Sequence, residues 1–212
     1  MNITRDNQEL IKRTSKKFIE QKLSLNPNWK ILDIGCGYGA NKYANVISDV
    51  QDLSEYYKDK NFVRIKEKKL PFLDKEFDFV IASHVLEHVD DIKFFISELE
   101  RISSSGYIEV PTILEDNLVF ENKTDHIWHM NFDDDKNILL ISKKIQYFEP
   151  VLTVSTIKRF HEIFRKSLVL ELSWENKIDY NILDIDLSGF QKYSILTLFR
   201  KYISKRIRMI LK

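Results

Sequence analysis

Hydrophobic residues change their spacing after the first two dozen positions of the chain. Residues 4–24 carry apolar side chains at helical spacing, and Pro27 ends that stretch. Short runs of mostly consecutive apolar residues then follow at 29–34, 44–50, 61–65, 76–82 and 106–110. Strands that are covered on both faces have this pattern, so the runs predict a parallel sheet in the interior.

One amphipathic segment separates the fourth run from the fifth. Asp90 is the predicted N-cap of a helix that extends to about Ser103, with its apolar side chains on one face. This succession of strands and helices predicts an α/β fold with a doubly wound, Rossmann-like sheet. Since no repeat and no low-complexity linker divides the sequence, we expect residues 1–212 to form one domain.

The pattern changes again after the fifth run. Residues 112–150 hold two strand-like halves around an acidic turn at 133–135, which predicts a β-hairpin inserted over the carboxyl edge of the sheet as a lid. A helix near 154–167 should precede two strands that turn at 175–177. We expect these strands to form the last, antiparallel pair of the sheet, followed by a basic amphipathic helix at 188–212.

Composition narrows the class of protein. The chain has 212 residues, 43% of them hydrophobic, which is enough for one substantial core. Its one cysteine, Cys36, excludes an internal disulfide and fits a reducing compartment, and no apolar run approaches the ~20 residues of a membrane span, so we expect a cytoplasmic protein. The net charge of +1 gives no support for binding to nucleic acid.

Basic residues concentrate at the C-terminal end. Segment 188–212 holds seven basic residues and no acidic residue. Its hydrophobic side chains share one helical stripe, made of Ile195, Phe199, Tyr202, Ile203, Ile207 and Ile210. A helix of this kind packs on its own domain, forms a dimer, or lies on an anionic membrane as a peripheral contact, and the sequence leaves these alternatives open.

The sequence "ILDIGCGYGANKYANVISD" places a glycine-rich turn between two apolar runs. Three of the five glycines of the chain stand in this turn, at Gly35, Gly37 and Gly39. Asp33 precedes the turn, where it would repel a pyrophosphate, and Asp49 follows sooner than the ~20 residues usual for a dinucleotide site. The pattern instead favours an amino acid joined to a nucleoside. Asp33 would face its ammonium, the N–H groups of the turn its carboxylate, and Asp49 its ribose hydroxyls.

Three motifs in the same order, "ILDIGCGYG", "LPFLDKEFDFVIASHVLEHVDD" and "ELERISSSGYIEVP", resemble class I S-adenosylmethionine-dependent methyltransferases of the small-molecule type. The resemblance covers residues 29–111. The sequences "SSSGYIEVP" and "DHIWH" further resemble methyltransferase-like proteins encoded with bacterial surface-glycan genes. The resemblance implies a sheet of strand order 3-2-1-4-5-7-6 and the cofactor S-adenosyl-L-methionine across the carboxyl ends of strands 1, 2 and 4.

The resemblance also implies a set of cofactor-binding residues. They are Asp33, Gly35, Cys36, Gly37, Gly39, Asp49, Leu70, Ser83 and His84. In this set Asp33 and the backbone of 35–39 would hold the methionine portion, while Asp49 would hold the ribose, with Asp52 as the alternative. Leu70 would cover the adenine, and Ser83 and His84 would lie beside the transferable methyl group.

Two positions depart from the family pattern. Lys66, followed by Glu67, stands where the family usually has an aspartate that bonds the adenine amine. Only eleven residues separate Asp33 from Asn45, fewer than a parallel crossover with a helix usually takes. The first helix of the fold should therefore be a stub.

The resemblance predicts methyl transfer to a hydroxyl or amine of a small molecule, with a sugar or a surface-glycan precursor as the narrower expectation. The acceptor would attack the methyl group in line with the sulfonium sulfur, which leaves. His126, or His84 as the second candidate, would remove the proton of the acceptor.

His126 and His129 would point to opposite faces of an alternating strand, so we expect no shared metal. His88 is expected only to begin a helix. Three aromatic residues are expected to be packing residues: Trp128, Trp174 and Phe132. Trp128, in the predicted lid, is also a candidate platform for the substrate.

Two other functional classes stay open at this point. A non-catalytic partner or regulatory module in a glycan or lipid pathway would keep the fold without the reaction. A nicotinamide oxidoreductase would use the same glycine turn for a dinucleotide.

Overall fold

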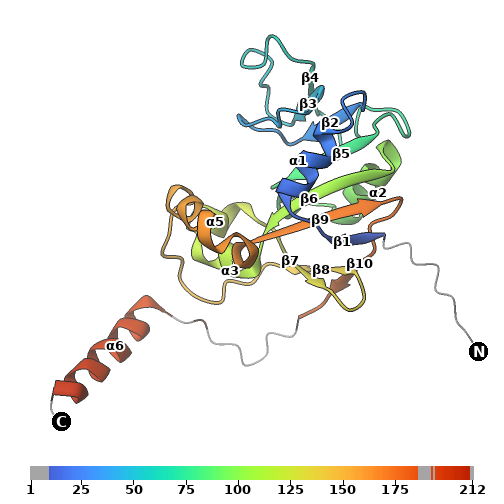
Figure 1. Ribbon diagram of the computed structural model, residues 1–212. Helices are drawn as coiled ribbons and strands as arrows, with labels where there is room; N and C mark the ends of the chain where they lie inside the picture. The colour runs from blue at the N-terminus through green and yellow to red at the C-terminus, as the bar shows by residue number, and fades with distance from the viewer. Residues whose placement is uncertain (1–9, 186–191, 193, 211–212) are drawn as a thin grey trace, which may run out of the picture.

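A seven-stranded sheet forms the centre of the computed structural model, which describes residues 10–185, 192 and 194–210 (Figure 1). The strand order is β4-β3-β2-β5-β6-β9-β1. Five parallel strands make up most of it: β2 (Ile31–Ile34), β3 (Val46–Asp49), β4 (Phe62–Arg64), β5 (Phe79–Ser83) and β6 (Ser105–Pro111). The predicted doubly wound α/β sheet is confirmed, with the five apolar runs as its parallel strands.

The remaining two strands come from opposite ends of the chain. β9 (Val169–Glu175) runs antiparallel to β6, and β1 (Ile11–Arg13) runs antiparallel to β9 at the edge. The prediction of one helix over 4–24 is therefore wrong at residues 11–13, where Ile11 is fully buried and pairs with Trp174. Within the described part of this range, the helical segment is α1 (Lys16–Ser24), and Ser15 caps it by accepting a hydrogen bond from the N–H of Phe18. Positions 4–9 of the prediction lie outside the described residues.

A smaller three-stranded sheet contains the predicted hairpin. β7 (Trp128–Asp133) and β8 (Ile138–Lys143) pair antiparallel around the acidic turn, as expected. β10 (Tyr180–Leu183) was expected to pair with β9, but it joins β8 in parallel instead. The chain does turn at 175–177, yet that turn carries it from the large sheet into the small one.

The small sheet packs against a face of the large sheet and forms part of the main core. Met130, Phe132, Leu139 and Ile141 are buried in the same cluster as Leu172 of β9. The hairpin is thus a structural layer, and the expectation of a lid over the carboxyl edge is wrong because these side chains are fixed in the core. Trp128, Trp174 and Phe132 are buried, as predicted for packing residues.

Helices complete the two layers around the large sheet. They are η1 (Leu86–His88), α2 (Ile92–Ile102), α3 (Ile113–Leu118), α4 (Asn122–Asp125) and α5 (Val154–Leu168). α2 packs on the face that carries Leu32 and Val80, whereas α1 packs on the opposite face against Ile31 and Phe79. Asp91, one residue later than expected, is the N-cap of α2, and its side chain accepts a hydrogen bond from Phe94.

Two further features concern the segment after β2 and the C-terminal end. Residues 35–45 form turns without a helix, so the predicted stub is reduced to nothing. α6 (Ile195–Ile210) forms the predicted C-terminal helix, has no buried residue and stands apart from both sheets in Figure 1. Within the described residues, no helix combines the length and apolar character that crossing a bilayer requires.

Candidate active site

A cleft of about 760 Å³ lies at the carboxyl ends of β2, β3 and β5. Its walls are formed by Ile34, Gly35, Gly37, Asp49, Val50, Gln51, Ile65, Lys66, Glu67, Lys68, Leu70, His84, Val85, His88, Val89, Asp90, Asp91, Phe94 and Phe95. Ligand sites of small molecules occupy volumes of this order, and parallel α/β sheets place them at this edge. The cleft is therefore the candidate active site.

The cleft brings together part of the residue set implied by the family resemblance. Gly35, Gly37, Asp49, Leu70 and His84 line it, although they come from separate segments of the chain. The others, Asp33, Cys36, Gly39 and Ser83, are not among the lining residues. The roles of all nine residues in holding a cofactor stay predictions.

The N–H groups of the glycine turn already have partners inside the protein. Those of Gly35 and Cys36 donate to the Ser48 carbonyl at 2.7 and 3.1 Å, and that of Gly37 donates to Asp49 Oδ2 at 2.9 Å. The Gly39 N–H donates to the Cys36 carbonyl at 3.2 Å. Three of these bonds attach the turn to β3, and the bond of Gly39 lies within the turn. Binding of a ligand carboxylate by these amides stays a prediction.

Gly35 is required by its backbone and by its neighbour. Its φ is +67°, a left-handed conformation that glycine adopts without steric cost. A Cβ at this position would lie 2.4 Å from Cγ2 of Val85. The close approach keeps the turn against the segment after β5, so both walls of the cleft depend on it.

Asp33 lies behind the turn with its carboxylate buried. Its Oδ2 accepts a hydrogen bond from the Asn41 N–H at 2.7 Å, which holds the far limb of the loop. Burial raises the pKa of Asp33 to about 6, against the opposing effects of this bond and of Lys16. Burial also raises the pKa of the Cys36 thiol to about 12, so that side chain acts as an apolar packing residue.

Asp49 is the carboxylate that lines the cleft beside the glycine turn. It accepts hydrogen bonds from the N–H groups of Gly37 and Gln51, both at 2.9 Å, and a carboxylate has further lone pairs for ligand hydroxyls. Asp52 is exposed and bonded to Ser54 at 2.6 Å and Arg64 at 3.1 Å. Of the two candidates for the ribose, only Asp49 lines the cleft.

The opposite wall is held by an ion pair on α2. Leu70 donates its N–H to Glu98 Oε2 at 2.7 Å, and Arg101 donates to the Leu70 carbonyl at 3.1 Å. Glu98 and Arg101 also bind each other at 2.7 Å. Lys66 and Glu67 both line the cleft beside Leu70, so this wall has a carboxylate although the family's aspartate is replaced by lysine.

His84 lies between two carboxylates at the end of β5. Its Nδ1 is 3.2 Å from Glu87 Oε1 and its Nε2 is 3.4 Å from Glu109 Oε1, with a left-handed φ of +56°. Burial alone would lower the pKa of His84, but the hydrogen bonds to Glu109 and Glu87 raise it to about 10. The raised pKa favours the protonated ring, which cannot accept a further proton. The role of His84 as a general base stays a prediction.

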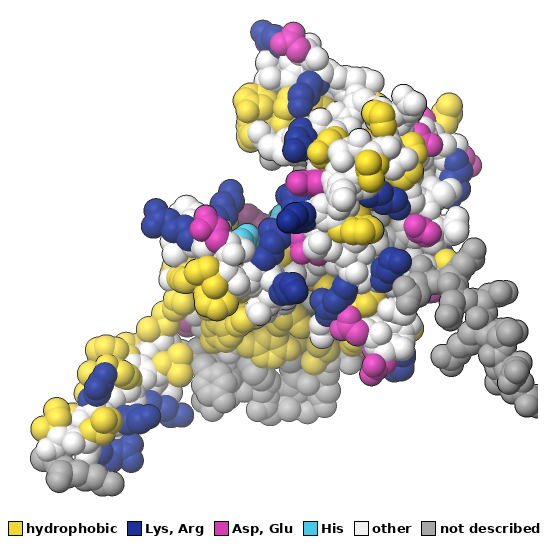
Figure 2. Space-filling model, in the orientation of Figure 1, with side chains coloured by type: hydrophobic (Ala, Val, Ile, Leu, Met, Phe, Trp, Pro, Cys, Tyr) yellow, Lys and Arg dark blue, Asp and Glu magenta, His cyan; other side chains and the backbone are white. Residues whose placement is uncertain are grey.

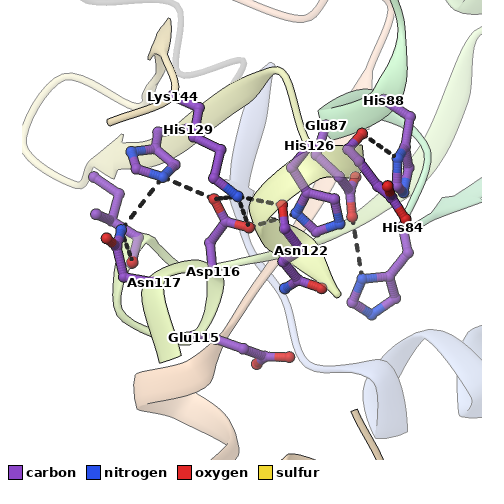
Figure 3. Close-up of polar contacts among 12 residues, drawn as sticks. His84, Glu87, His88, Glu115, Asp116, Asn117, Asn122, His126, His129 and Lys144 are labelled. Atoms are coloured by element: carbon purple, nitrogen blue, oxygen red, sulfur yellow. Dashed lines mark hydrogen bonds and ion pairs between the residues drawn. The ribbon is translucent and has the colours of Figure 1, made fainter. Parts of the chain in front are cut away.

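His126 lies beside the cleft rather than in its wall. Figure 3 shows it between Asp116 and His88, and its Nδ1 donates to Asp116 Oδ1 at 2.5 Å. His129 reaches the other oxygen of Asp116 at 2.7 Å, and Lys144 also binds this carboxylate at 3.1 Å. The expected opposite orientation of the two histidines is wrong, because His126 precedes β7 and both meet one carboxylate. Its role as a base stays a prediction.

Several residues of the site were missed by the sequence interpretation. His88 lines the cleft, and its ring meets that of His126 edge to face with 4.6 Å between centroids. Its Nδ1 is 2.9 Å from the Asp125 carbonyl. The motif "LEHVDD" contains His88, but the sequence pattern predicts only a helix start there. Asp116 carried no signal, since a helical "ILEDN" segment predicts no buried carboxylate.

Sequence comparison assigns the chain to a family. Residues 2–150 match the family described as Methyltransferase domain. The chain belongs to this family. It is 34% identical over 120 residues to an uncharacterized protein of Methanocaldococcus jannaschii, which covers 50% of this chain and 48% of that protein. It is 26% identical over 113 residues to a sterol 24-C-methyltransferase of Gibberella zeae, covering 43% of this chain and 29% of the enzyme. The chain thus spans about half the length, or less, of these relatives.

Solved structures similar to this chain include several methyltransferases. The Pyrococcus horikoshii protein PH0226 has 15% identity and a TM-score of 0.43, with coverage of 77% of this chain and 93% of that one. The methyltransferase CalH, crystallised in complex with SAH, has 18% identity and a TM-score of 0.37, with coverage of 44% and 35%.

Proposed function

We propose that this chain transfers a methyl group from S-adenosyl-L-methionine to a hydroxyl or amine of a small molecule, with a sugar or surface-glycan precursor as the acceptor class. The observation that carries the proposal is the meeting of Gly35, Asp49, Leu70 and His84 around one cleft. These residues belong to separate motifs of the sequence. Because the chain belongs to the methyltransferase domain family, we interpret their common cleft as the cofactor site.

The two walls suit different parts of the cofactor. Asp49 has acceptor lone pairs for the two ribose hydroxyls, and Leu70 presents an apolar surface for the adenine. Glu67, in the wall beside Leu70, replaces the missing aspartate as the acceptor for the adenine amine. The protein contributes alignment of the acceptor with the methyl group and exclusion of water.

The charged rim of the cleft supports the proposed acceptor class. Lys66, Lys68, Asp90 and Asp91 place charged donors and acceptors along a wall that also contains Phe94. Such groups can bind several hydroxyls of a sugar at once. The sterol methyltransferase relative points to another acceptor, and the charged rim is the reason for preferring the sugar.

Calorimetry with S-adenosylhomocysteine tests the cofactor site. We expect Asp49→Ala to weaken binding at least ~10-fold, since it removes a charged acceptor of hydroxyl hydrogen bonds. The matched control is Asp52→Ala, which removes an exposed carboxylate outside the cleft and should leave binding unchanged. An absence of binding by the unaltered chain would refute the proposal.

A methyl-transfer assay with labelled cofactor then separates an enzyme from a silent binder. The acceptors are a panel of nucleotide sugars, lipid-linked sugars and sterols. Transfer to a sugar supports the proposal, transfer to a sterol overturns the acceptor class, and binding without any transfer identifies a non-catalytic partner. Binding of NAD in place of S-adenosylhomocysteine would identify an oxidoreductase.

We also propose that α6 brings this domain to an anionic membrane. The helix has five basic residues, at 200, 201, 205, 206 and 208, and no acidic one, and its hydrophobic side chains are exposed. Figure 2 shows hydrophobic and basic side chains along α6 with no acidic side chain in view. Helices of this composition lie in the interface of anionic bilayers, where each cation contributes about 1 kcal/mol.

Sedimentation with lipid vesicles tests this contact. The full chain should bind vesicles that contain phosphatidylglycerol and should not bind pure phosphatidylcholine. Replacing Arg200 and Lys201 by glutamate should abolish binding at unchanged thermal stability, since both side chains are exposed. Dimerisation detected by light scattering, without vesicle binding, would contradict the membrane role.

A further inference from the structure

We infer that Glu87, His88 and His126 form a binding site for one divalent transition-metal ion of the zinc type at the margin of the cleft. One ligand atom from each residue lies within 4.8 Å of those from the other two. Two imidazoles and one carboxylate are a donor set that binds Zn²⁺ or Fe²⁺ and keeps a coordination position open. A tetrahedral ion with bonds of roughly 2.1 Å needs ligands about 3.4 Å apart, so binding requires a small inward movement.

Both histidines are oriented as metal ligands are. The Nδ1 of His126 donates to the Asp116 carboxylate at 2.5 Å, and the Nδ1 of His88 donates to the Asp125 carbonyl at 2.9 Å. These bonds put the ring proton on Nδ1 and leave the lone pair on Nε2. Metal-binding histidines usually have this arrangement: one ring nitrogen binds the metal, and the other donates its N–H to a carboxylate or a backbone carbonyl.

The third ligand has an oxygen available. Glu87 is 1% exposed, and its Oε1 faces His84 at 3.2 Å. Its other oxygen, Oε2, is buried and makes no hydrogen bond to any described part of the chain. A buried carboxylate oxygen without a partner is costly, and an ion between this oxygen and the two imidazoles would remove that cost.

The position gives the ion a route and a function. His88 is exposed and lines the cleft, so an ion can enter from the solvent side. If the chain transfers methyl groups as proposed above, an acceptor hydroxyl could bind the ion at its open coordination position. The ion would lower the pKa of that hydroxyl, so it would lose its proton more readily.

Metal titration of the full chain, stripped with a chelator and free of cofactor and acceptor, tests the site. We expect calorimetry with Zn²⁺ to show one ion per chain, and Co²⁺ to give the visible absorption of a tetrahedral site. His88→Ala and His126→Gln should each weaken binding at least ~10-fold, and Asp116→Asn should weaken it similarly by releasing the His126 ring. His88 is exposed, so the first variant should fold even if the others do not.

His161→Ala is the matched control, because His161 also pairs with a carboxylate, Glu115 at 2.9 Å, but lies outside the cluster. It should bind Zn²⁺ as the unaltered chain does. The inference fails if the unaltered chain binds no ion, or if binding is the same in His88→Ala. Since neither measurement uses methyl transfer, the metal site and the proposed function can fail separately.

Discussion

Replacing Asp33 by asparagine should stabilise the cofactor-free protein at neutral pH. The carboxylate is 4% exposed, and its pKa rises from 3.8 to about 6 on folding. A group whose pKa is higher in the folded state binds protons more tightly there, so its ionisation opposes folding. The penalty is small below about pH 4, grows between pH 4 and 6 and is complete above pH 6.

The shift sets the size of the expected effect. A difference of 6 minus 3.8, or 2.2 pKa units, corresponds to about 3 kcal/mol at 1.36 kcal/mol per unit. Asparagine keeps an oxygen for the Asn41 N–H, so little of this gain should be lost. For a chain of this length the melting temperature should rise by roughly 6 to 12 °C at pH 7.5 and by much less at pH 4.

Thermal and urea unfolding at several pH values provide the assay. Asp52→Asn is the control: its carboxylate is exposed and hydrogen bonds to Ser54 lower its pKa, so this variant should give no stabilisation at neutral pH. The reasoning is refuted if Asp33→Asn is no more stable at pH 7.5, or if its advantage does not depend on pH. Weaker binding of S-adenosylhomocysteine by the stabilised variant would further support a contact between Asp33 and the ammonium.

Three other substitutions test contacts that shape the site, each by chemical denaturation. Asp116→Asn should have the opposite sign to Asp33→Asn and cost about 3 kcal/mol, because His126, His129 and Lys144 all bind this carboxylate; an unchanged midpoint would contradict the network. Gly35→Ala should cost about 1 to 2 kcal/mol through its left-handed φ and the contact with Val85, and Val85→Ala in the same chain should recover part of that loss. Arg101→Leu should cost about 2 kcal/mol of stability and should also weaken cofactor binding, because Arg101 and Glu98 hold Leu70 in the wall of the cleft. Lower stability with normal cofactor binding would show that these contacts do not shape the cofactor site.

The interior of the fold was predictable because each parallel strand buries its residues on both faces. The consecutive apolar residues from Phe79 to Ala82, all of them buried, are an example of this pattern. The edge strand at 11–13 was not predictable, since only Ile11 among its residues is buried and helical spacing surrounds it. β10 shows the same difficulty: its partner depends on where the preceding turn directs the chain, which no local pattern specifies.

The site residues that belong to a sequence motif were predictable, whereas the contacts that depend on tertiary packing were not. Asp49 and Leu70 line the cleft as the motifs implied. The partners of the glycine amides, such as the Ser48 carbonyl, were not predictable because they lie on another strand. His126 and His129 share Asp116 for a similar reason, since the carboxylate comes from a helix that sequence spacing does not relate to them.

The pairing of β1 with β9 has a consequence for how the protein is made. Ile11 is joined to Trp174, so the ribosome must synthesise more than 160 further residues before the first strand finds its neighbour. Residues 34–95, which contain every wall of the cleft, emerge well before that moment. The ligand pocket can therefore assemble on the nascent chain while the open side of β6 still needs protection from other chains, and β9 followed by β1 closes that side last.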